Sequence, residues 1–359
     1  MRIGVPKEIK NHEYRVGLLP SGVRELTRRN HKVVIETQAG AGVGFSDEDY
    51  MNAGAIIAGS AQEIYQFADL VVKVKEPQPN ECLMLKPGQL LFTYLHLAAD
   101  AHQAELLKAS GCTAIGYETL MDADGHLPLL TPMSEIAGRF AVQSGAYFLQ
   151  KATGGSGVLL SGAPGVLPGH VVILGGGVVG ESVLRVALGL GARVTVLDRN
   201  INRLRQLEEI YGNCLHTLYS TTDAIEMELL DADLVVGAVL IPGGAAPKLV
   251  NREMLSLMKH GSVLVDVAID QGGCFATSRP TTHADPIYQV DGIIHYCVAN
   301  IPSAVARTAT QALTNATLPY VLQLAEQGEE ALSTPAFSGG LNVKAGQIVH
   351  PAVVAALAQ

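Results

Sequence analysis

The stretch VVILGGGVVGESVLRVALGLGARVTVLD, residues 171–198, decides the fold of this chain. An apolar run leads into a glycine-rich turn, a helical pattern follows, and a second apolar run ends at Asp198. Gly175 permits the tight turn, Gly177 lets the backbone approach a pyrophosphate, and Gly180 allows the helix to pack closely on the strand. The pattern predicts a strand–helix–strand unit that binds a dinucleotide.

The acid that ends the second strand indicates which dinucleotide binds. Asp198 follows the glycines by about 20 residues, where a carboxylate accepts hydrogen bonds from both ribose hydroxyls of NAD and repels the extra phosphate of NADP. Arg199 and Arg203 resemble the basic pairs that hold a 2′-phosphate in NADP enzymes. We favour NAD because Asp198 occupies the ribose position itself. The pyrophosphate is expected at the N-terminus of a helix that begins near Val178.

Composition narrows the class of protein. The 359 residues are 48% hydrophobic and 16% charged, enough for large cores and two domains. The net charge of −9, without a basic block, argues against binding to nucleic acid.

The opening MRIGVPKEIK enters a strand pattern directly, and no apolar run approaches ~20 residues, so we expect a soluble, cytoplasmic protein without membrane contact. Five scattered cysteines predict reduced thiols, and the absence of HExxH or a Cys/His cluster predicts no metal.

Two series of apolar runs predict two parallel sheets covered by helices on both faces. The later series forms the nucleotide domain: 171–175, 193–198, 216–220, 234–240, 262–270 and 292–298. The earlier series lacks a glycine fingerprint, which indicates a substrate domain: 2–6, 32–37, 55–59, 70–75, 89–96 and 113–117.

Two long helical patterns join these halves, at residues 131–152 and 302–328, with a kink expected at Pro319. The nucleotide domain is complete near residue 299, so the tail is expected to pack on the first domain. We therefore predict two doubly wound, Rossmann-like α/β domains flanking a cleft. The substrate domain is discontinuous, 1–130 plus 305–359, and the NAD-binding domain is 131–304. Residues 341–351 predict a small hairpin with Ala345 and Gly346 at its turn.

Three charged residues lie at the carboxyl ends of predicted strands, where open parallel sheets bind ligands. Lys75 ends VVKVKEP, His96 ends LLFTYLH, and Asp270 ends VLVDVAID. If the two sheets face each other across the cleft, all three point into it, and their shared location favours a catalytic role.

Each of these residues also has a structural interpretation. Lys75 could lie on an exposed edge strand beside Lys73. His96 could be bonded within a loop, and Asp270 could cap a turn made by the next two glycines. Arg15, in a polar loop after the first strand, would ordinarily be a solvated surface residue.

The chain resembles the alanine dehydrogenase and transhydrogenase α-subunit family from end to end, most closely its L-alanine dehydrogenases. The segments that carry the resemblance are MRIGVPKEIKNHEYRVGLLP, KVKEP, TYLHLA, GGGVVG, VDVAIDQGG and HYCVANIPSAVARTAT.

The resemblance implies reversible oxidative deamination of L-alanine to pyruvate and ammonium with NAD, by a cytoplasmic homohexamer assembled through the long-helix region. It implies that Lys75, His96 and Asp270 are catalytic and that Arg15, Lys75, His96 and Asn300 bind substrate. It implies NAD contacts at Ser134, Gly175, Gly177, Val178, Val179, Gly180, Asp198, Arg203, Ser220, Val239, Leu240, Val267, Asp270, Arg279 and Asn300. Some relatives carry a metal pair in the second long helix, where this chain has Gln323 and Gln327, which reinforces the prediction of no metal.

Three alternatives stay open. A transhydrogenase nucleotide-binding subunit would work with a membrane partner, but the resemblance indicates that such subunits lack the histidine found here as His96. A saccharopine-type dehydrogenase would need a larger amino acid pocket. A non-catalytic NAD-binding protein would give no NADH from alanine.

Overall fold

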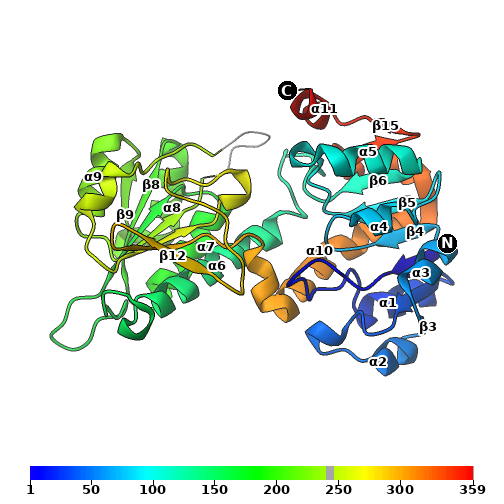
Figure 1. Cartoon of the computed structure of the whole chain (residues 1–359), viewed down its shortest axis with the longest axis horizontal. Helices are drawn as coiled ribbons and strands as arrows, with labels where there is room; N and C mark the ends of the chain where they lie inside the picture. The colour runs from blue at the N-terminus through cyan, green and yellow to red at the C-terminus, as the bar shows by residue number, and fades with distance from the viewer. Residues whose placement is uncertain (240–245, 359) are drawn as a thin grey trace. The chain divides into compact units, whose positions relative to one another are not determined.

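The computed structural model describes residues 1–239 and 246–358. The chain divides into two compact units, each built on its own sheet (Figure 1). The N-terminal unit comprises Met1–Met133 and Val305–Gln359, and the central unit comprises Ser134–Ala304. The predicted fold class, two α/β domains with mainly parallel sheets, is confirmed.

The N-terminal unit holds an eight-stranded sheet among its described residues, in the order β15-β14-β6-β5-β4-β1-β2-β3. Its strands are β1 Arg2–Val5, β2 Lys32–Glu36, β3 Ile56–Ala58, β4 Leu70–Val72, β5 Leu90–Thr93, β6 Thr113–Gly116, β14 Leu341–Lys344 and β15 Gln347–Ile348. The first six are parallel, and β14 pairs antiparallel with β6 and β15. The predicted C-terminal hairpin is confirmed, with positive φ at Ala345 and Gly346.

The central unit holds a seven-stranded sheet among its described residues, in the order β12-β13-β11-β10-β7-β8-β9. Its strands are β7 His170–Leu174, β8 Arg193–Asp198, β9 His216–Tyr219, β10 Leu234–Gly237, β11 Val263–Asp266, β12 Ile287–Val290 and β13 Ile293–Tyr296. The sequence analysis missed β12, a partly exposed strand that pairs antiparallel with β13.

Both sheets contain the doubly wound order third-second-first-fourth-fifth-sixth, counted along their parallel strands. In such a sheet the ligand binds beyond the carboxyl ends of the first and fourth strands, where the order reverses. These strands are β1 and β4 in the N-terminal unit, and β7 and β10 in the central unit. Topology therefore marks one candidate binding edge in each unit.

Helices cover the sheets (Figure 1). The N-terminal unit has α1 Pro20–Arg28, α2 Asp47–Asn52, α3 Ala61–Phe67, α4 Pro79–Cys82, α5 Ala101–Ser110, α10 Ala306–Gln327 and α11 Pro351–Leu357, with 3₁₀ turns at Ala41–Val43, Leu97–Ala99, Gly328–Ser333 and Pro335–Phe337. The central unit has most of α6 Thr131–Phe148, then α7 Val178–Gly189, α8 Ile201–Tyr211 and α9 Thr222–Leu229. Its 3₁₀ turns lie at Lys151–Thr153, Gly212–Cys214, Glu253–Leu257, Ile269–Gln271 and Ile301–Val305.

Both long helices differ from their predicted bounds. The first, α6, ends at Phe148 rather than near residue 152, because a separate 3₁₀ turn follows. The second, α10, begins at Ala306, because residues 301–305 form a 3₁₀ turn. Pro319 lies within α10 without ending it.

The apolar runs extend beyond the strands that they predict. The run 70–75 is a strand only to Val72, the run 89–96 only to Thr93, and the run 262–270 only to Asp266. The run 234–240 is a strand to Gly237, and its last residue lies outside the described residues. The expectation that Lys75, His96 and Asp270 end their strands is therefore wrong, because buried loop residues continue the apolar pattern after the ladder stops. All three lie in the loops that follow those strands.

The core explains why the strands read as unbroken apolar runs. Along β7, Val171 and Ile173 pack in one buried cluster, and Val172 and Leu174 pack in another. Successive side chains of a strand point to opposite faces, so both faces of the sheet must be covered. Full burial of such a side chain contributes about 1.5–3 kcal/mol.

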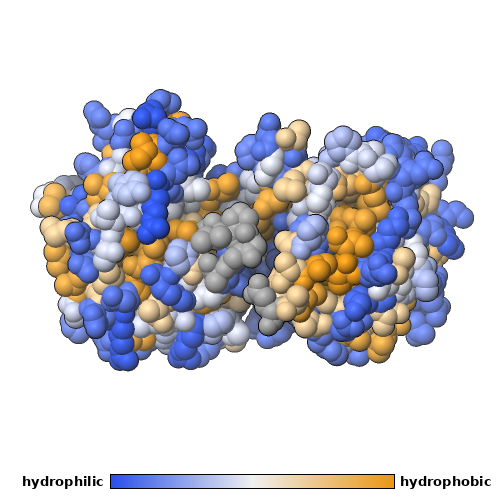
Figure 2. Space-filling view, turned by 90° about the horizontal axis from the view of Figure 1, so that it is seen from above, coloured by the Kyte–Doolittle hydropathy of each residue, from blue (hydrophilic) through white to orange (hydrophobic). Residues whose placement is uncertain are grey.

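The surface adds two observations. None of the helices in the described parts of the chain is long and apolar enough to span a bilayer. Figure 2 looks onto the face of the N-terminal unit that carries α11 and shows apolar side chains gathered there. Val349 and Val354, beside and within this helix, are both exposed.

Candidate active site

The glycine turn of the central unit has the geometry that a pyrophosphate requires. Gly175 has a φ of 105°, and a Cβ there would lie 2.8 Å from the carbonyl oxygen of Ala238. A Cβ on Gly180 would lie 1.8 Å from the carbonyl oxygen of Gly175. Gly177, the residue before α7, has no atom within 4 Å of such a Cβ, so the backbone faces open space. The turn therefore leaves room beside the N-terminus of α7, where Val178 and Val179 begin the helix.

Asp198 is fixed beside this turn. Its Oδ2 accepts the N–H of Gly176 at 2.6 Å, and its Oδ1 accepts the N–H of Asn200 at 2.7 Å. Each carboxylate oxygen has a second lone pair, so both can still accept a ribose hydroxyl. The carboxylate thus has the fixed position that recognition of a ribose needs.

Arg203 is also bound to this turn. Its Nε donates to the carbonyl oxygen of Gly176 at 2.6 Å, and its Nη2 donates to Glu181 at 2.5 Å. The guanidinium is therefore engaged with the protein's own acceptors. Sequence reasoning missed the contributions of Gly176 and Glu181, although both lie within the fingerprint segment.

The other predicted cofactor residues of the central unit lie near strand ends. Ser220 follows β9, is buried, and donates its N–H to the carbonyl oxygen of Asp198 at 3.1 Å. Val239 follows β10, and Val267 follows β11. Ser134 lies in the first turns of α6. Leu240 lies outside the described residues.

Arg279 and Asn300 occupy ordered loops. The guanidinium of Arg279 lies over the ring of Tyr288, 4.2 Å from its centroid. Asn300 has a φ of 64°, and its carbonyl oxygen accepts the hydroxyl of Ser303 at 3.0 Å. Left-handed backbone at a residue other than glycine is uncommon and is concentrated at functional sites.

The exposed Asp270 lies in a 3₁₀ turn, and Asp266 holds the loop that carries it. Asp266 is fully buried, and its Oδ1 accepts the N–H of Ala268 at 3.2 Å. Its Oδ2 accepts the N–H of Cys274 at 2.8 Å and the hydroxyl of Ser278. Burial raises the pKa of Asp266, and these hydrogen bonds oppose that effect. Sequence reasoning missed this acid, although it ends β11 within the segment VLVDVAID.

In the N-terminal unit, Arg15 is a buried residue and not a solvated one. Its exposed fraction is 2%, and it forms a bidentate ion pair with Glu13, Nε to Oε1 at 2.7 Å and Nη2 to Oε2 at 2.6 Å. Its Nη1 lies 3.1 Å from the sulfur of Met133. Burial favours a lower pKa for Arg15, but Glu13 outweighs it and the pKa is raised. The cation is thus held in one orientation.

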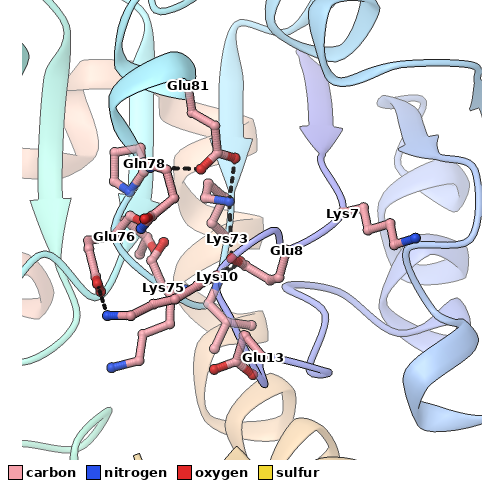
Figure 3. A network of polar contacts seen from close by, with 12 residues as sticks. Lys7, Glu8, Lys10, Glu13, Lys73, Lys75, Glu76, Gln78 and Glu81 are labelled. Carbon is pink, nitrogen blue, oxygen red and sulfur yellow. Dashed lines mark hydrogen bonds and ion pairs between the residues drawn. The ribbon is translucent and has the colours of Figure 1, made fainter.

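Lys75 lies beyond β4, at the edge that the strand order marks. The alternative of an exposed edge strand is wrong, because β4 lies between β1 and β5, and both Lys73 and Lys75 are buried. Lys73 forms ion pairs with Glu8 and Glu81. Figure 3 shows the side chain of Lys75 extending away from this group.

His96 follows β5 with a φ of 52°. Its N–H donates to Glu118 at 2.6 Å, and its ring stacks on that of Tyr94 with centroids 5.7 Å apart. The residue is exposed. The alternative of a histidine bonded inside a loop therefore holds for the main-chain N–H of His96 but not for its exposed imidazole ring. Sequence reasoning missed Glu118, which follows the neighbouring parallel strand β6.

The described residues include one group of side chains close enough to share an ion, Asp122, Asp124 and His126. All three are exposed, and Asp122 accepts the N–H groups of Asp124 and His126, so a turn accounts for the cluster. In α10, Gln323 donates to Gln327 at 3.3 Å and to Thr334 at 3.1 Å. The absence of a metal stays a prediction.

Comparisons with known proteins identify the family of this chain. Residues 4–137 match the family pattern Alanine dehydrogenase/PNT, N-terminal domain, and residues 141–351 match Alanine dehydrogenase/PNT, C-terminal domain. The chain belongs to the alanine dehydrogenase/PNT family.

Individual relatives separate the branches of the alanine dehydrogenase/PNT family. Alanine dehydrogenase of Halomonas elongata is 58% identical over 99% of this chain and 96% of its own length. A solved L-alanine dehydrogenase superposes with a TM-score of 0.97 at 55% identity, covering 100% of this chain and 99% of that one. A transhydrogenase from Sinorhizobium meliloti superposes with a TM-score of 0.84 at 24% identity, covering 98% of this chain and 100% of that one, which shows a shared fold. The dehydrogenase branch is therefore favoured over the transhydrogenase alternative.

Proposed function

We propose that this chain catalyses the reversible oxidative deamination of L-alanine to pyruvate and ammonium, with NAD as the cofactor. The observation that carries the proposal is the close match to alanine dehydrogenases over nearly the whole chain. The two candidate binding edges agree with it. The edge in the central unit offers open backbone at Gly177 and the fixed acid Asp198, as a dinucleotide requires. The edge in the N-terminal unit offers the buried cations Arg15 and Lys75, as a small carboxylate requires.

The substrate groups belong to the N-terminal unit. Arg15, oriented by Glu13, would bind the carboxylate of alanine or pyruvate. Lys75 would bind the same substrate and stabilise the negative charge that develops on the carbonyl oxygen. His96, whose main chain is anchored by Glu118, would exchange protons with the imine and carbinolamine intermediates.

The cofactor groups belong mainly to the central unit. NAD, when bound, would accept the hydride from the α-carbon of alanine. The backbone at Gly175, Gly177 and Gly180 and the start of α7 would hold the pyrophosphate, and Asp198 would hold the ribose. Asp270 would serve the proton transfers beside the nicotinamide. The remaining predicted NAD contacts are Ser134, Val178, Val179, Arg203, Ser220, Val239, Leu240, Val267, Arg279 and Asn300, with Asn300 also touching substrate.

NAD rather than NADP is the proposed cofactor for two reasons. Asp198 is an anion at the place where NADP carries its phosphate. Arg203, one of the two arginines that could compensate, is already bound to Glu181 and to the carbonyl oxygen of Gly176.

We also propose a homohexamer in the cytoplasm. An apolar patch on the face that carries α11, and the exposed Leu159, Val166 and Leu167 after α6, are surface that self-association would cover. The cysteines are unpaired, as expected in a reducing compartment. Light scattering at micromolar concentration tests the assembly, and a monomer would contradict it.

The activity test is NADH formation by the purified protein across small and large amino acids. Alanine should be the best substrate. Lys75→Ala and His96→Ala should each lower turnover by at least ~100-fold, the scale of a lost acid, base or oxyanion partner, with NADH affinity nearly unchanged. Activity with lysine and none with alanine would overturn the proposed substrate. Full turnover by His96→Ala would overturn the proposed catalytic role of His96.

A further inference from the structure

The main chain that carries Lys75 is fixed at every polar group from Lys73 to Lys75. Two of its six groups pair with the main chain of the β5 segment, since the N–H of Lys73 donates to the carbonyl oxygen of Phe92 at 3.1 Å and the N–H of Tyr94 donates to Val74 at 3.2 Å. Side chains bind the other four: Tyr117 donates to the carbonyl oxygen of Lys73 at 3.0 Å, Thr93 donates to that of Lys75 at 2.9 Å, and Glu8 accepts the N–H groups of Val74 at 2.7 Å and Lys75 at 3.3 Å.

Glu8 is the charged member of this set, and it comes from the loop after β1. Its Oε1 accepts both N–H groups, and its Oε2 accepts the ammonium of Lys73 at 3.1 Å. The side chain is buried, and burial raises the pKa of Glu8 while Lys73 opposes that effect. One carboxylate thus links the loop after β1 to the main chain after β4, the two strands at which the sheet order reverses. The link is made at Val74 and at Lys75 itself.

Glu81 offers a matched comparison in the same cluster (Figure 3). It also pairs with Lys73, at 2.7 Å, and is also buried. Its described hydrogen bonds go to Lys73, to the hydroxyl of Tyr65 and to the N–H of Gln78. Both acids neutralise the same buried ammonium, but only Glu8 is described as binding the main chain at Val74 and Lys75.

We propose that Glu8 is a positioning residue that holds the main chain under Lys75 in the geometry needed for turnover. The inference rests on the proposed role of Lys75. A displacement of about 1 Å in a catalytic group can lower a rate roughly a hundredfold. If the cluster were only an ion network of the core, Glu8 and Glu81 would be equivalent in catalysis.

The experiment compares Glu8→Ala with Glu81→Ala in the full-length protein. Both variants leave Lys73 with one carboxylate, so both should lower the melting temperature. Only Glu8→Ala should lower kcat for pyruvate reduction, by at least tenfold, with NADH affinity unchanged. Glu8→Gln retains an oxygen that can accept both N–H groups, so it should keep kcat within about threefold of wild type.

A second measurement does not depend on activity. Amide hydrogen exchange of a peptide covering residues 73–77 should accelerate in Glu8→Ala and stay near wild type in Glu81→Ala. If Glu8→Ala does not fold, Glu8→Asp replaces it in both assays. Its shorter side chain keeps the charge but cannot reach Lys73 and the main chain together, so it should show the same two effects.

The outcomes separate the two proposals. A wild-type protein without alanine or pyruvate turnover would contradict the proposed function, and the exchange measurement would still decide whether Glu8 holds the main chain. Turnover in the wild type with equal losses of kcat in Glu8→Ala and Glu81→Ala would overturn the positioning role. Unchanged exchange at residues 73–77 in the Glu8 variant would also overturn it.

Discussion

Replacing Gly180 by alanine tests whether close contact between α7 and the glycine turn shapes the dinucleotide site. The new Cβ would lie 1.8 Å from the carbonyl oxygen of Gly175, whereas such atoms essentially never approach within 3.0 Å. The obstructing atom is main chain, so no side chain can rotate away. Either the helix or the turn must move by roughly 1 Å in a closely packed interior.

Two effects of opposite sign decide the magnitude. Alanine inside a helix is favoured over glycine by about 1 kcal/mol. Forcing an extra methyl group into a packed core costs about 1–3 kcal/mol, and the rigid obstacle here places Gly180→Ala at the upper end. The net loss of about 1–2 kcal/mol corresponds to a melting temperature lower by roughly 2–8 °C for a domain of this size. NADH should bind at least tenfold more weakly, about 1.4 kcal/mol, because the turn and the helix start are displaced together.

Two other glycines of the same segment provide controls. A Cβ on Gly189, the last residue of α7, would meet no atom within 4 Å, so Gly189→Ala should leave both stability and NADH affinity intact. A Cβ on Gly177 would also meet no atom of the protein but would project into the proposed pyrophosphate site. Gly177→Ala should therefore keep the melting temperature and lose NADH affinity. The assays are thermal unfolding and NADH fluorescence titration. Wild-type values for Gly180→Ala in both would refute the reasoning.

Three further predictions concern the ribose site, the reacting amine and a buried histidine. Asp198→Ser should reduce the preference for NAD over NADP at least tenfold, since hydrogen bonds to a charged group contribute about 1.5–3 kcal/mol each; an unchanged ratio of kcat/KM values would contradict the ribose role. Deamination should accelerate as the pH rises, because the reacting amine must lose its proton, and an optimum below pH 6 would contradict this. Burial lowers the pKa of His295 in the folded protein, so below about pH 6.5 this histidine binds a proton more readily in the unfolded chain than in the folded one. The free energy of unfolding should therefore decrease as the pH falls, by up to about 1.4 kcal/mol per pH unit for this group. His295→Asn should flatten that dependence between pH 7 and pH 5 in urea unfolding, and an unchanged dependence would contradict the assignment.

The sequence was sufficient for the dinucleotide turn because that site is local. Gly175, Gly180 and Asp198 belong to one strand–helix–strand unit, and their spacing determines their geometry. The discontinuous packing of the C-terminal tail could also be inferred, since the sheet of the central unit is complete before α10 begins.

Long-range contacts were not predictable in the same way. Periodicity identifies β4 as a strand but does not show that it lies between β1 and β5, so it could not show that Lys73 is buried. The partners Glu8 and Glu81 come from two other segments, and a lysine in an apolar run fits a surface strand until such partners are known. The alternative of a solvated Arg15 is wrong for a different reason: its partner Glu13 is only two residues away, but their loop has no periodic pattern that would indicate burial.

The same strand order carries two different kinds of loop in this chain. At the first-to-fourth strand edge of the central unit, the exit of β7 packs main chain against main chain, since a Cβ on Gly175 would lie 2.8 Å from the carbonyl oxygen of Ala238. Gly177 faces open space at the start of α7, where the N–H groups of a helix N-terminus suit a phosphate. At the equivalent edge of the N-terminal unit, Gly17 makes a similar close approach to the carbonyl oxygen of Val72, but the loops around it contribute buried charges. Backbone alone would bind any suitable anion, whereas buried side chains such as Arg15 and Lys75 would select a carboxylate and act on the adjacent carbonyl under the proposed function. The proposed division of labour between cofactor and substrate would therefore arise from the loops at the carboxyl ends of the strands, and not from the sheets themselves.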